Sequence, residues 1–231
     1  RIAVELAPGV PWGCTEETMR CTYELAKQWD GGVHIHVAET RVELEMDRET
    51  KGMGHIEWMH SLGQLSPATQ LVHSVWLSDH EIDLIADSGA VVVHCPASNM
   101  YLGSGICQVK RLRERGVPVA LGLDGACNNG LGMIDLLKWA ANLQQVAHLD
   151  APALQAADVL EMACRGGAAA FGRPDQLGSL EPGKKADMVL VNRDSTRLAL
   201  ATPQSLPVAL VYTAGSADVD TVIVDGEILL Q

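Results

Sequence analysis

The sequence predicts an α/β fold in which helices cover a parallel sheet, followed by a small antiparallel β region. Strand-like runs alternate with amphipathic segments of helical period as far as Phe171, and this alternation is typical of βα units. Runs such as AVVV and VPVALGL are apolar on both faces, as parallel strands between helices are. After Phe171 the helical period ends, and short strands with Asp-Gly turns predict antiparallel pairing.

The first units show the alternation clearly. IAVELAP (residues 2–8) is strand-like, and residues 15–29 have the apolar period of a helix with Thr15 as its N-cap. VHIHVAE is the next predicted strand. HIEWMHSLG then predicts a helix that ends at Gly63.

The same order continues along the chain. QLVHSV, AVVVHCP and VPVALGLD are predicted strands, which makes five strands before Asp124. SDHEIDLIADSG is a helix with Ser78 as its cap and Gly89 at its end, and further helices are expected over GICQVKRLRERG and around residues 135–146 and 156–171. LGSLEPGKKADMVLVN, ALVYTAG and DVDTVIVDGEILLQ predict the short strands of a second part. We therefore divide the chain into residues 1–171 and 172–231.

Composition excludes several classes of protein. The net charge of −12 argues against a nucleic-acid surface, because phosphates would be repelled. No apolar run approaches the roughly 20 residues that span a bilayer, and no secretory leader is visible. Six scattered cysteines without a CxxC pair are expected to be reduced thiols of a cytoplasmic protein. They are Cys14, Cys21, Cys95, Cys107, Cys127 and Cys164.

Polar side chains stand where four of the predicted strands end. They are His36 with Glu39, then His73, His94 and Asp124. Taken alone, a histidine in an apolar strand is more often a hydrogen-bonded core residue, and an aspartate is often a turn former. The carboxyl ends of parallel strands meet at one edge of a sheet, so recurrence on successive units favours a common site.

The residue types at this edge suit a metal ion. Imidazole and carboxylate ligands bind Zn²⁺ or Fe²⁺, and an open coordination position lowers the pKa of a bound water toward about 7. Glu39 follows His36 by three residues, so on a strand the two would face opposite ways; we expect Glu39 past the strand's end, where the loop turns back. His34 and His36 share a face, and spacing alone leaves open which of them binds metal.

Four stretches resemble the amidohydrolase superfamily. They are HIHVAET, LVHSVWLSDHEIDLIADSG, VVVHCPASNMYLGSGICQVKRLRERGVPVALGLDGACNNG and LGSLEPGKKADMVLVN. The resemblance is to the aminohydrolase branch, which holds S-adenosylhomocysteine/methylthioadenosine deaminases, guanine and 8-oxoguanine deaminases, and s-triazine hydrolases. It implies a (β/α)8 TIM barrel with a small β-sandwich made from both chain ends. This chain would then hold barrel strands 4–8.

The resemblance also implies roles for the strand-end residues. His36 looks like the metal ligand of strand 5, and Asp124 like the ligand of strand 8 that also acts as a base. Glu39 resembles the proton shuttle that contacts the substrate ring. His73 resembles the histidine that orients the water or the leaving amine.

The remaining polar residues are expected to support this set. Ser98 and Asn99 would brace the strand-7 loop. His94 would contact the metal ligands and not the metal itself. His34 would be a structural residue. Trp12 and Trp76 are candidate substrate-binding residues that stack on a ring, although packing explains either as well.

The implied activity is hydrolytic deamination of an amino-substituted N-heterocycle of purine, nucleoside or pterin type. One divalent metal, zinc or iron, would supply a hydroxide that attacks the ring carbon, and ammonia would leave. The implied partner is a small heterocyclic molecule, with no nucleic acid and no membrane, and a homo-oligomer is compatible with it.

Two departures from the family pattern qualify this. The family's metal-binding His-x-His of the first barrel strand has no counterpart here, and five strands do not close a barrel of eight. Because the chain also begins with Arg1, we expect it to be the C-terminal portion of a protein of about 400 residues or more. Gly9 occupies the position where adenosine-type deaminases of this branch usually carry a substrate-contacting histidine, which leaves room for a bare purine, a pterin or a triazine.

Three alternatives stay open at this point. A chloro- or alkylamino-triazine hydrolase would use the same chemistry on another leaving group. A non-catalytic scaffold would keep the fold without the reaction. A cyclic-amide hydrolase of the dihydroorotase type needs a bridging carboxylated lysine, and no predicted strand carries a lysine at the corresponding end.

Overall fold

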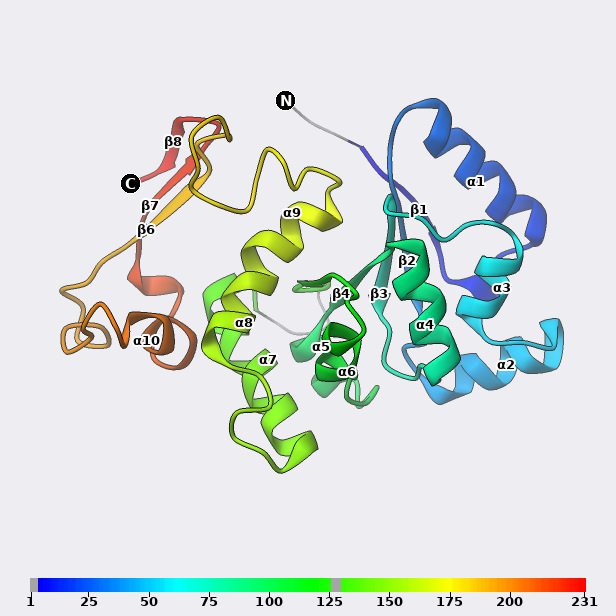
Figure 1. The fold of residues 1–231 in the computed structure, drawn as a ribbon, viewed down its shortest axis with the longest axis horizontal. Helices are drawn as coiled ribbons and strands as arrows, with labels where there is room; N and C mark the ends of the chain where they lie inside the picture. Colours follow the sequence, from blue (N-terminus) through cyan, green and yellow to red (C-terminus); the bar gives the residue numbers. More distant parts are fainter. Residues whose placement is uncertain (1–3, 126–129) are drawn as a thin grey trace.

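The computed structural model describes residues 4–125 and 130–231, and its larger sheet has five parallel strands (Figure 1). They are β1 (Leu6–Gly9), β2 (Val33–Val37), β3 (Thr69–His73), β4 (Val91–His94) and β5 (Val119–Leu121). Each strand pairs in parallel with the next one along the chain. Successive parallel strands joined by helices are the arrangement of a segment of a βα barrel. Cys127, for which the sequence predicts a free thiol, lies outside the described residues.

Helices connect these strands and continue beyond them. They are α1 (Glu16–Gln28), α2 (Arg41–Lys51), α3 (His55–Ser61), α4 (Asp79–Ser88), α5 (Pro96–Tyr101), α6 (Val109–Glu114), α7 (Met133–His148), α8 (Ala156–Glu161) and α9 (Gly167–Ala170). A π-helical segment (Met162–Gly166) links α8 to α9. Ser78 accepts a hydrogen bond from the backbone N–H of Glu81 to begin α4, which ends at the left-handed Gly89, as the sequence predicts.

Three of these helices differ from the predicted pattern, and one of them, α5, is not predicted at all. The helix α2 is not predicted, although Thr40 and Glu43 form a capping box at its start and the left-handed Gly52 ends it. The helix α6 is shorter than GICQVKRLRERG suggests. Residues 105–108 of that predicted stretch precede the helix, and Gly105 has a φ of +124°, which a helix does not allow.

The C-terminal region forms a separate antiparallel sheet of β6 (Met188–Val191), β7 (Val219–Val224) and β8 (Glu227–Leu230). Asp225 and Gly226 both have positive φ between β7 and β8, which is the hairpin turn that Asp-Gly predicts. The prediction of a strand at ALVYTAG is wrong, because this stretch belongs largely to the helix α10 (Leu206–Tyr212). Pro207 in its first turn favours a helix start, and packing against α7 and α8 overrides the β propensity of its valines.

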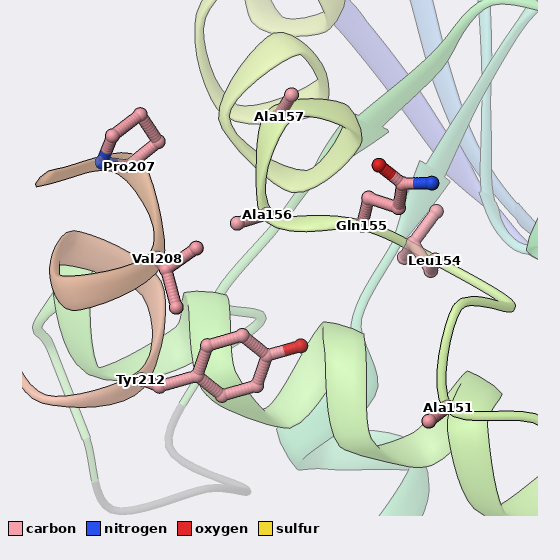
Figure 2. A pocket seen from close by; sticks show the side chains of 8 residues that line it. All are labelled: Ala151, Leu154, Gln155, Ala156, Ala157, Pro207, Val208 and Tyr212. Atoms are coloured by element: carbon pink, nitrogen blue, oxygen red, sulfur yellow. The ribbon is translucent and has the colours of Figure 1, made fainter. Parts of the chain in front are cut away.

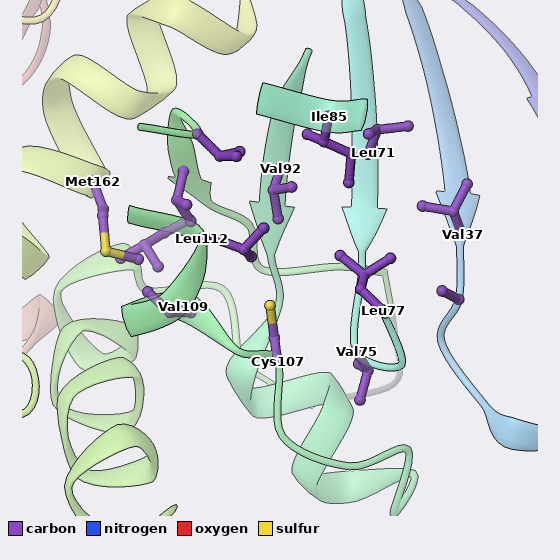
Figure 3. Close-up of a cluster of buried hydrophobic side chains, with 14 of the residues drawn as sticks. Val37, Leu71, Val75, Leu77, Ile85, Val92, Cys107, Val109, Leu112 and Met162 are labelled. Carbon is purple, nitrogen blue, oxygen red and sulfur yellow. The ribbon is translucent and has the colours of Figure 1, made fainter. Parts of the chain in front are cut away.

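Apolar side chains pack on both faces of the parallel sheet. On one face Ile35, Leu71 and Val92 meet the covering helices in the main buried cluster, part of which Figure 3 shows. On the other face a smaller cluster joins Val72 and Val93 to Ala170 at the end of α9. Each fully buried Leu, Ile or Met side chain stabilises the fold by about 1.5–3 kcal/mol, so this core fixes the strands whose ends carry the polar residues.

A groove of about 340 Å³ lies between α8 and α10 (Figure 2). Ala156, Val208 and Tyr212 line it, and Gln145 donates a hydrogen bond to the Tyr212 hydroxyl. None of the polar residues at the strand ends lines this groove. Among the helices of the described ranges, none is long and apolar enough to cross a membrane. The division of the chain after residue 171 stays a prediction.

Candidate active site

The carboxyl edge of the parallel sheet brings three of the predicted residues together. Nε2 of His73 lies 3.6 Å from a Glu39 carboxylate oxygen and 3.9 Å from one of Asp124. The ring of His36 lies 5.4 Å from that of His73, centroid to centroid. Both carboxylate distances exceed that of a direct hydrogen bond, so the three groups lie close together without being bonded to one another. Glu39, His73, Asp124 and His36, all named from the sequence, therefore meet at this edge of the sheet.

Unusual backbone conformations accompany this edge. Of the seven non-glycine residues with positive φ in the described part, four lie here: Ala38, His73, Ser74 and Asp124. Such conformations cost of order 1 kcal/mol each and cluster at functional sites. At Ala38, with a φ of 49°, the chain leaves the alternation of β2, and Glu39 comes to face His73. This places Glu39 past the strand's end, where the sequence predicts it.

Asp124 is held as a carboxylate. The Ser98 hydroxyl donates to one oxygen at 2.5 Å, and the backbone N–H of Gly125 donates to the other at 2.6 Å. Burial raises the pKa of Asp124, but these two hydrogen bonds and the charges of His73 and His36 outweigh it, so the pKa lies below its usual value. The group is therefore ionised and able to bind a cation or accept a proton at neutral pH.

His73 has a defined orientation. Its Nδ1–H donates to the side-chain oxygen of Asn99 at 2.9 Å, which leaves Nε2 to face Glu39 and Asp124. Asn99 and Ser98 both come from α5, so one short helix contacts His73 and Asp124 at once. The resemblance implies that these two residues brace the strand-7 loop, and that role stays a prediction.

His34 and His36 differ in what their rings contact. His36 donates from Nδ1 to the Gly9 carbonyl at 3.2 Å, which leaves Nε2 as the atom available to a metal. His34 donates from Nδ1 to Gln70 at 2.8 Å, within a network at the other end of the strands. Among residues 4–125 and 130–231, no three His, Cys, Asp or Glu side chains are arranged to hold a metal ion by themselves.

His94 ends β4 and is fully buried. Neither of its ring nitrogens has a hydrogen bond within the described residues. Burial, with a smaller effect of the His73 charge, lowers the pKa of His94 to about 3, so the ring is neutral at ordinary pH.

The chain that carries this arrangement matches a known protein family. The model of the amidohydrolase family matches residues 1–229. The chain belongs to the amidohydrolase family. The resemblance seen in the sequence is thereby confirmed.

Named relatives of this amidohydrolase chain are deaminases and triazine hydrolases. The 5'-deoxyadenosine deaminase of Methanothermobacter thermautotrophicus is 46% identical over 233 residues, which cover all of this chain and 53% of that protein. An adenosine deaminase of Xanthomonas campestris, solved with bound zinc, has a TM-score of 0.91 at 36% identity and covers 97% of this chain and 51% of its own. Atrazine chlorohydrolase of Arthrobacter aurescens, solved with zinc, has a TM-score of 0.89 at 29% identity over all of this chain and 50% of its own.

The chain thus spans about half the length of the relatives it matches. The fold prediction is confirmed: this is a portion of a TIM barrel with an appended small antiparallel β region.

The two tryptophans named as substrate-binding candidates lie differently in this amidohydrolase chain. Trp12 is 43% exposed in a 3-10 turn (Pro11–Gly13) after β1. Trp76 follows β3, donates from its indole N–H to the Ser104 carbonyl at 2.7 Å, and carries the Arg41 guanidinium 4.1 Å above its ring. Because the Ser104 hydroxyl bonds to Glu39, Ser104 connects Trp76 to the Glu39 side of the site.

Ser104 is a site residue that the sequence alone does not indicate. Its hydroxyl donates to a Glu39 carboxylate oxygen at 2.9 Å, while its carbonyl accepts from Trp76. The one signal near it is Gly105, where a Cβ would lie 2.8 Å from the Trp76 ring. Ser104 therefore fixes one Glu39 oxygen and leaves the other to face His73.

Proposed function

We propose that the full-length protein is a metal-dependent hydrolytic deaminase of an amino-substituted N-heterocycle. The observation that carries this proposal is the meeting of Glu39, His73 and Asp124, with His73 Nε2 3.6 and 3.9 Å from the two carboxylates. The names of the relatives favour an adenine nucleoside, such as 5'-deoxyadenosine, as the first substrate to test. Gly9 has no side chain, so we expect no side-chain contact with a nucleoside at that position.

The chain offers part of a metal site, and its donor chemistry fits zinc or iron. Nε2 of His36 and the Asp124 carboxylate would hold the ion, and the other ligands would come from outside the described residues. When bound, the ion would supply a water with a pKa lowered toward about 7. Zinc is the first choice, because structures of two relatives contain it.

The chain's own residues would handle the protons. Asp124, kept ionised, accepts the proton of the attacking water. Glu39 delivers a proton to the ring nitrogen next to the reacting carbon. His73, held through Asn99, orients the water or the departing amine.

Substitution Glu39→Gln in the full-length protein tests this assignment. Ammonia release from 5'-deoxyadenosine should fall by about 10²–10⁴-fold, because an amide cannot carry the proton. Glu45→Gln, on an exposed position of α2, is the matched control and should release ammonia at the normal rate. Unchanged turnover in the Glu39 variant would rule out its role as proton carrier.

A triazine hydrolase is the second candidate. Gly9 in place of a histidine and the similarity to atrazine chlorohydrolase favour it. Release of chloride or alkylamine from a substituted triazine, with no ammonia from purines, would establish it. A protein that contains no zinc or iron by elemental analysis, and gains no activity with either, would be a scaffold instead. A cytoplasmic location and a homo-oligomer stay predictions.

A further inference from the structure

Ala38 lies between the proposed ligand His36 and the proposed proton carrier Glu39, and its backbone is bonded on both sides. It is fully buried, with a φ of 49°. Its carbonyl accepts from the backbone N–H groups of Val75 and Trp76 at 3.0 and 2.9 Å. Its own N–H lies beyond the paired residues of β2, which end at Val37, and it donates to a side chain instead.

That side chain is His55, at the start of α3. Nδ1 of its ring accepts the Ala38 N–H at 2.8 Å, so Nδ1 carries no proton. In the neutral ring the proton is then on Nε2, which lies 3.2 Å from a carboxylate oxygen of Asp47. His55 and Asp47 are both fully buried. The network thus assigns the Nε2–H tautomer.

A cation completes the network behind Asp47. Lys51 donates from Nζ to the second Asp47 oxygen at 2.5 Å and to the Pro11 carbonyl at 3.1 Å. Its Nζ also lies 4.5 Å from the centre of the Trp58 ring. Burial lowers the pKa of His55 despite the opposing charge of Asp47, which keeps Nδ1 free of a proton.

We propose that His55, which lies beside Asp47, is a positioning residue that fixes the Ala38 peptide and so directs the Glu39 carboxylate into the site. This inference rests on the proposed function, because it concerns the direction of the proposed proton carrier. Glu39 is the residue after Ala38, so a rotation of the Ala38 peptide would move the Glu39 carboxylate away from His73. Without His55, the buried Ala38 N–H would lose its partner and the left-handed turn would lose its support.

A pair of substitutions separates the hydrogen bond from the bulk of the ring. In the full-length protein, His55→Asn keeps an acceptor oxygen close to the place of Nδ1, whereas His55→Leu has none. We expect kcat to fall about 100-fold in H55L with KM changed less than about threefold, and to fall less than about tenfold in H55N, since small misplacements of a reacting group cost that much.

Hydrogen exchange gives a readout that does not depend on activity. Deuterium uptake at the Ala38 amide should rise in H55L and stay close to the wild-type level in H55N. Thr69→Val is the control for loss of a buried polar contact elsewhere. It removes the hydrogen bond from Thr69 to the Gln64 carbonyl at the amino end of β3, and it should lower stability without changing kcat or exchange at Ala38. Where H55L does not fold, His55→Gln replaces it, because its longer side chain puts the amide group nearer the place of Nε2 than that of Nδ1.

The outcomes distinguish this inference from the proposed function. A folded H55L protein with wild-type kcat, beside an inactive Glu39→Gln protein, would overturn the positioning role and leave the proposed function standing. A loss of activity that matches the loss of folded protein, with equal kcat per folded molecule, would overturn it as well. Full turnover by Glu39→Gln would contradict the proposed function itself.

Discussion

The two ends of the parallel strands satisfy their polar groups in different ways. At the amino end, the Gln70 amide accepts from His34 and donates to Glu5 and to the Ala170 carbonyl, at 2.6 to 2.8 Å. At the carboxyl end, His73 faces two carboxylates at 3.6 and 3.9 Å, and His94 has no hydrogen bond to any described residue. Polar groups at the amino end are joined by direct hydrogen bonds, whereas those named at the carboxyl end lie close together without bonding to one another.

The contrast is sharpest within β2, where two histidines stand two residues apart. His34 is bonded to a side chain of the next strand, while His36 is bonded to a backbone carbonyl and keeps its second nitrogen available. In βα barrels, the amino end of the strands serves stability and the carboxyl end carries the chemistry. The same residue type therefore has two roles, and position along the strand decides which.

Substitution Asp124→Asn should have the largest effect and tests the carboxyl end. We expect kcat to fall by about 10³-fold, because the base is lost, and the metal content of the full-length protein to fall, because an amide is a weaker ligand. Steady-state kinetics and elemental analysis measure both.

The control lies at the opposite end of the same sheet. Glu5→Gln alters a carboxylate that contacts Gln70 and should leave kcat and metal content unchanged. If Glu5→Gln reduced kcat as much as Asp124→Asn, the division between a stabilising end and a reactive end would be wrong.

Substitution Gln70→Leu tests the amino end and should act on stability. It leaves Glu5, His34 and the Ala170 carbonyl without their partner, and a buried polar group without a partner costs about 1–3 kcal/mol. Urea denaturation should show this loss, while kcat per folded molecule stays at the wild-type value. A lower kcat in fully folded protein would show that this network also shapes the site.

The strands, their order and the residues at their ends could be predicted from the sequence, because apolar period and strand-end position are local signals. His36, Glu39, His73 and Asp124 all follow from that pattern. The strand prediction failed at ALVYTAG, where contacts with α7 and α8 decide the conformation.

Residues that act through distant contacts leave no comparable signal. Ser104 bonds to Glu39 across 65 positions of the chain, and His55 bonds to Ala38 across 17. Neither residue stands at a strand end, and a serine in a glycine-rich turn or a histidine at a helix start is common on the surface of a protein. Their partners are set by how the loops fold over the sheet edge, which local periodicity does not encode.

The last prediction concerns His94 and the loss of stability at acid pH, and it changes a slope and not the activity. Its folded pKa of about 3 lies below the ordinary value of 6.5, so between these pH values the unfolded chain binds a proton that the folded chain does not. Stability should therefore fall as the pH falls through this window, by at most about 1.4 kcal/mol per pH unit from this group. His94→Leu removes the proton uptake, so its free energy of unfolding should depend less steeply on pH between about 4 and 6 in urea titrations. Equal slopes in the two proteins would mean that a partner satisfies His94 in the full-length protein, and the contrast between the two strand ends would then rest on His73 and the carboxylates alone.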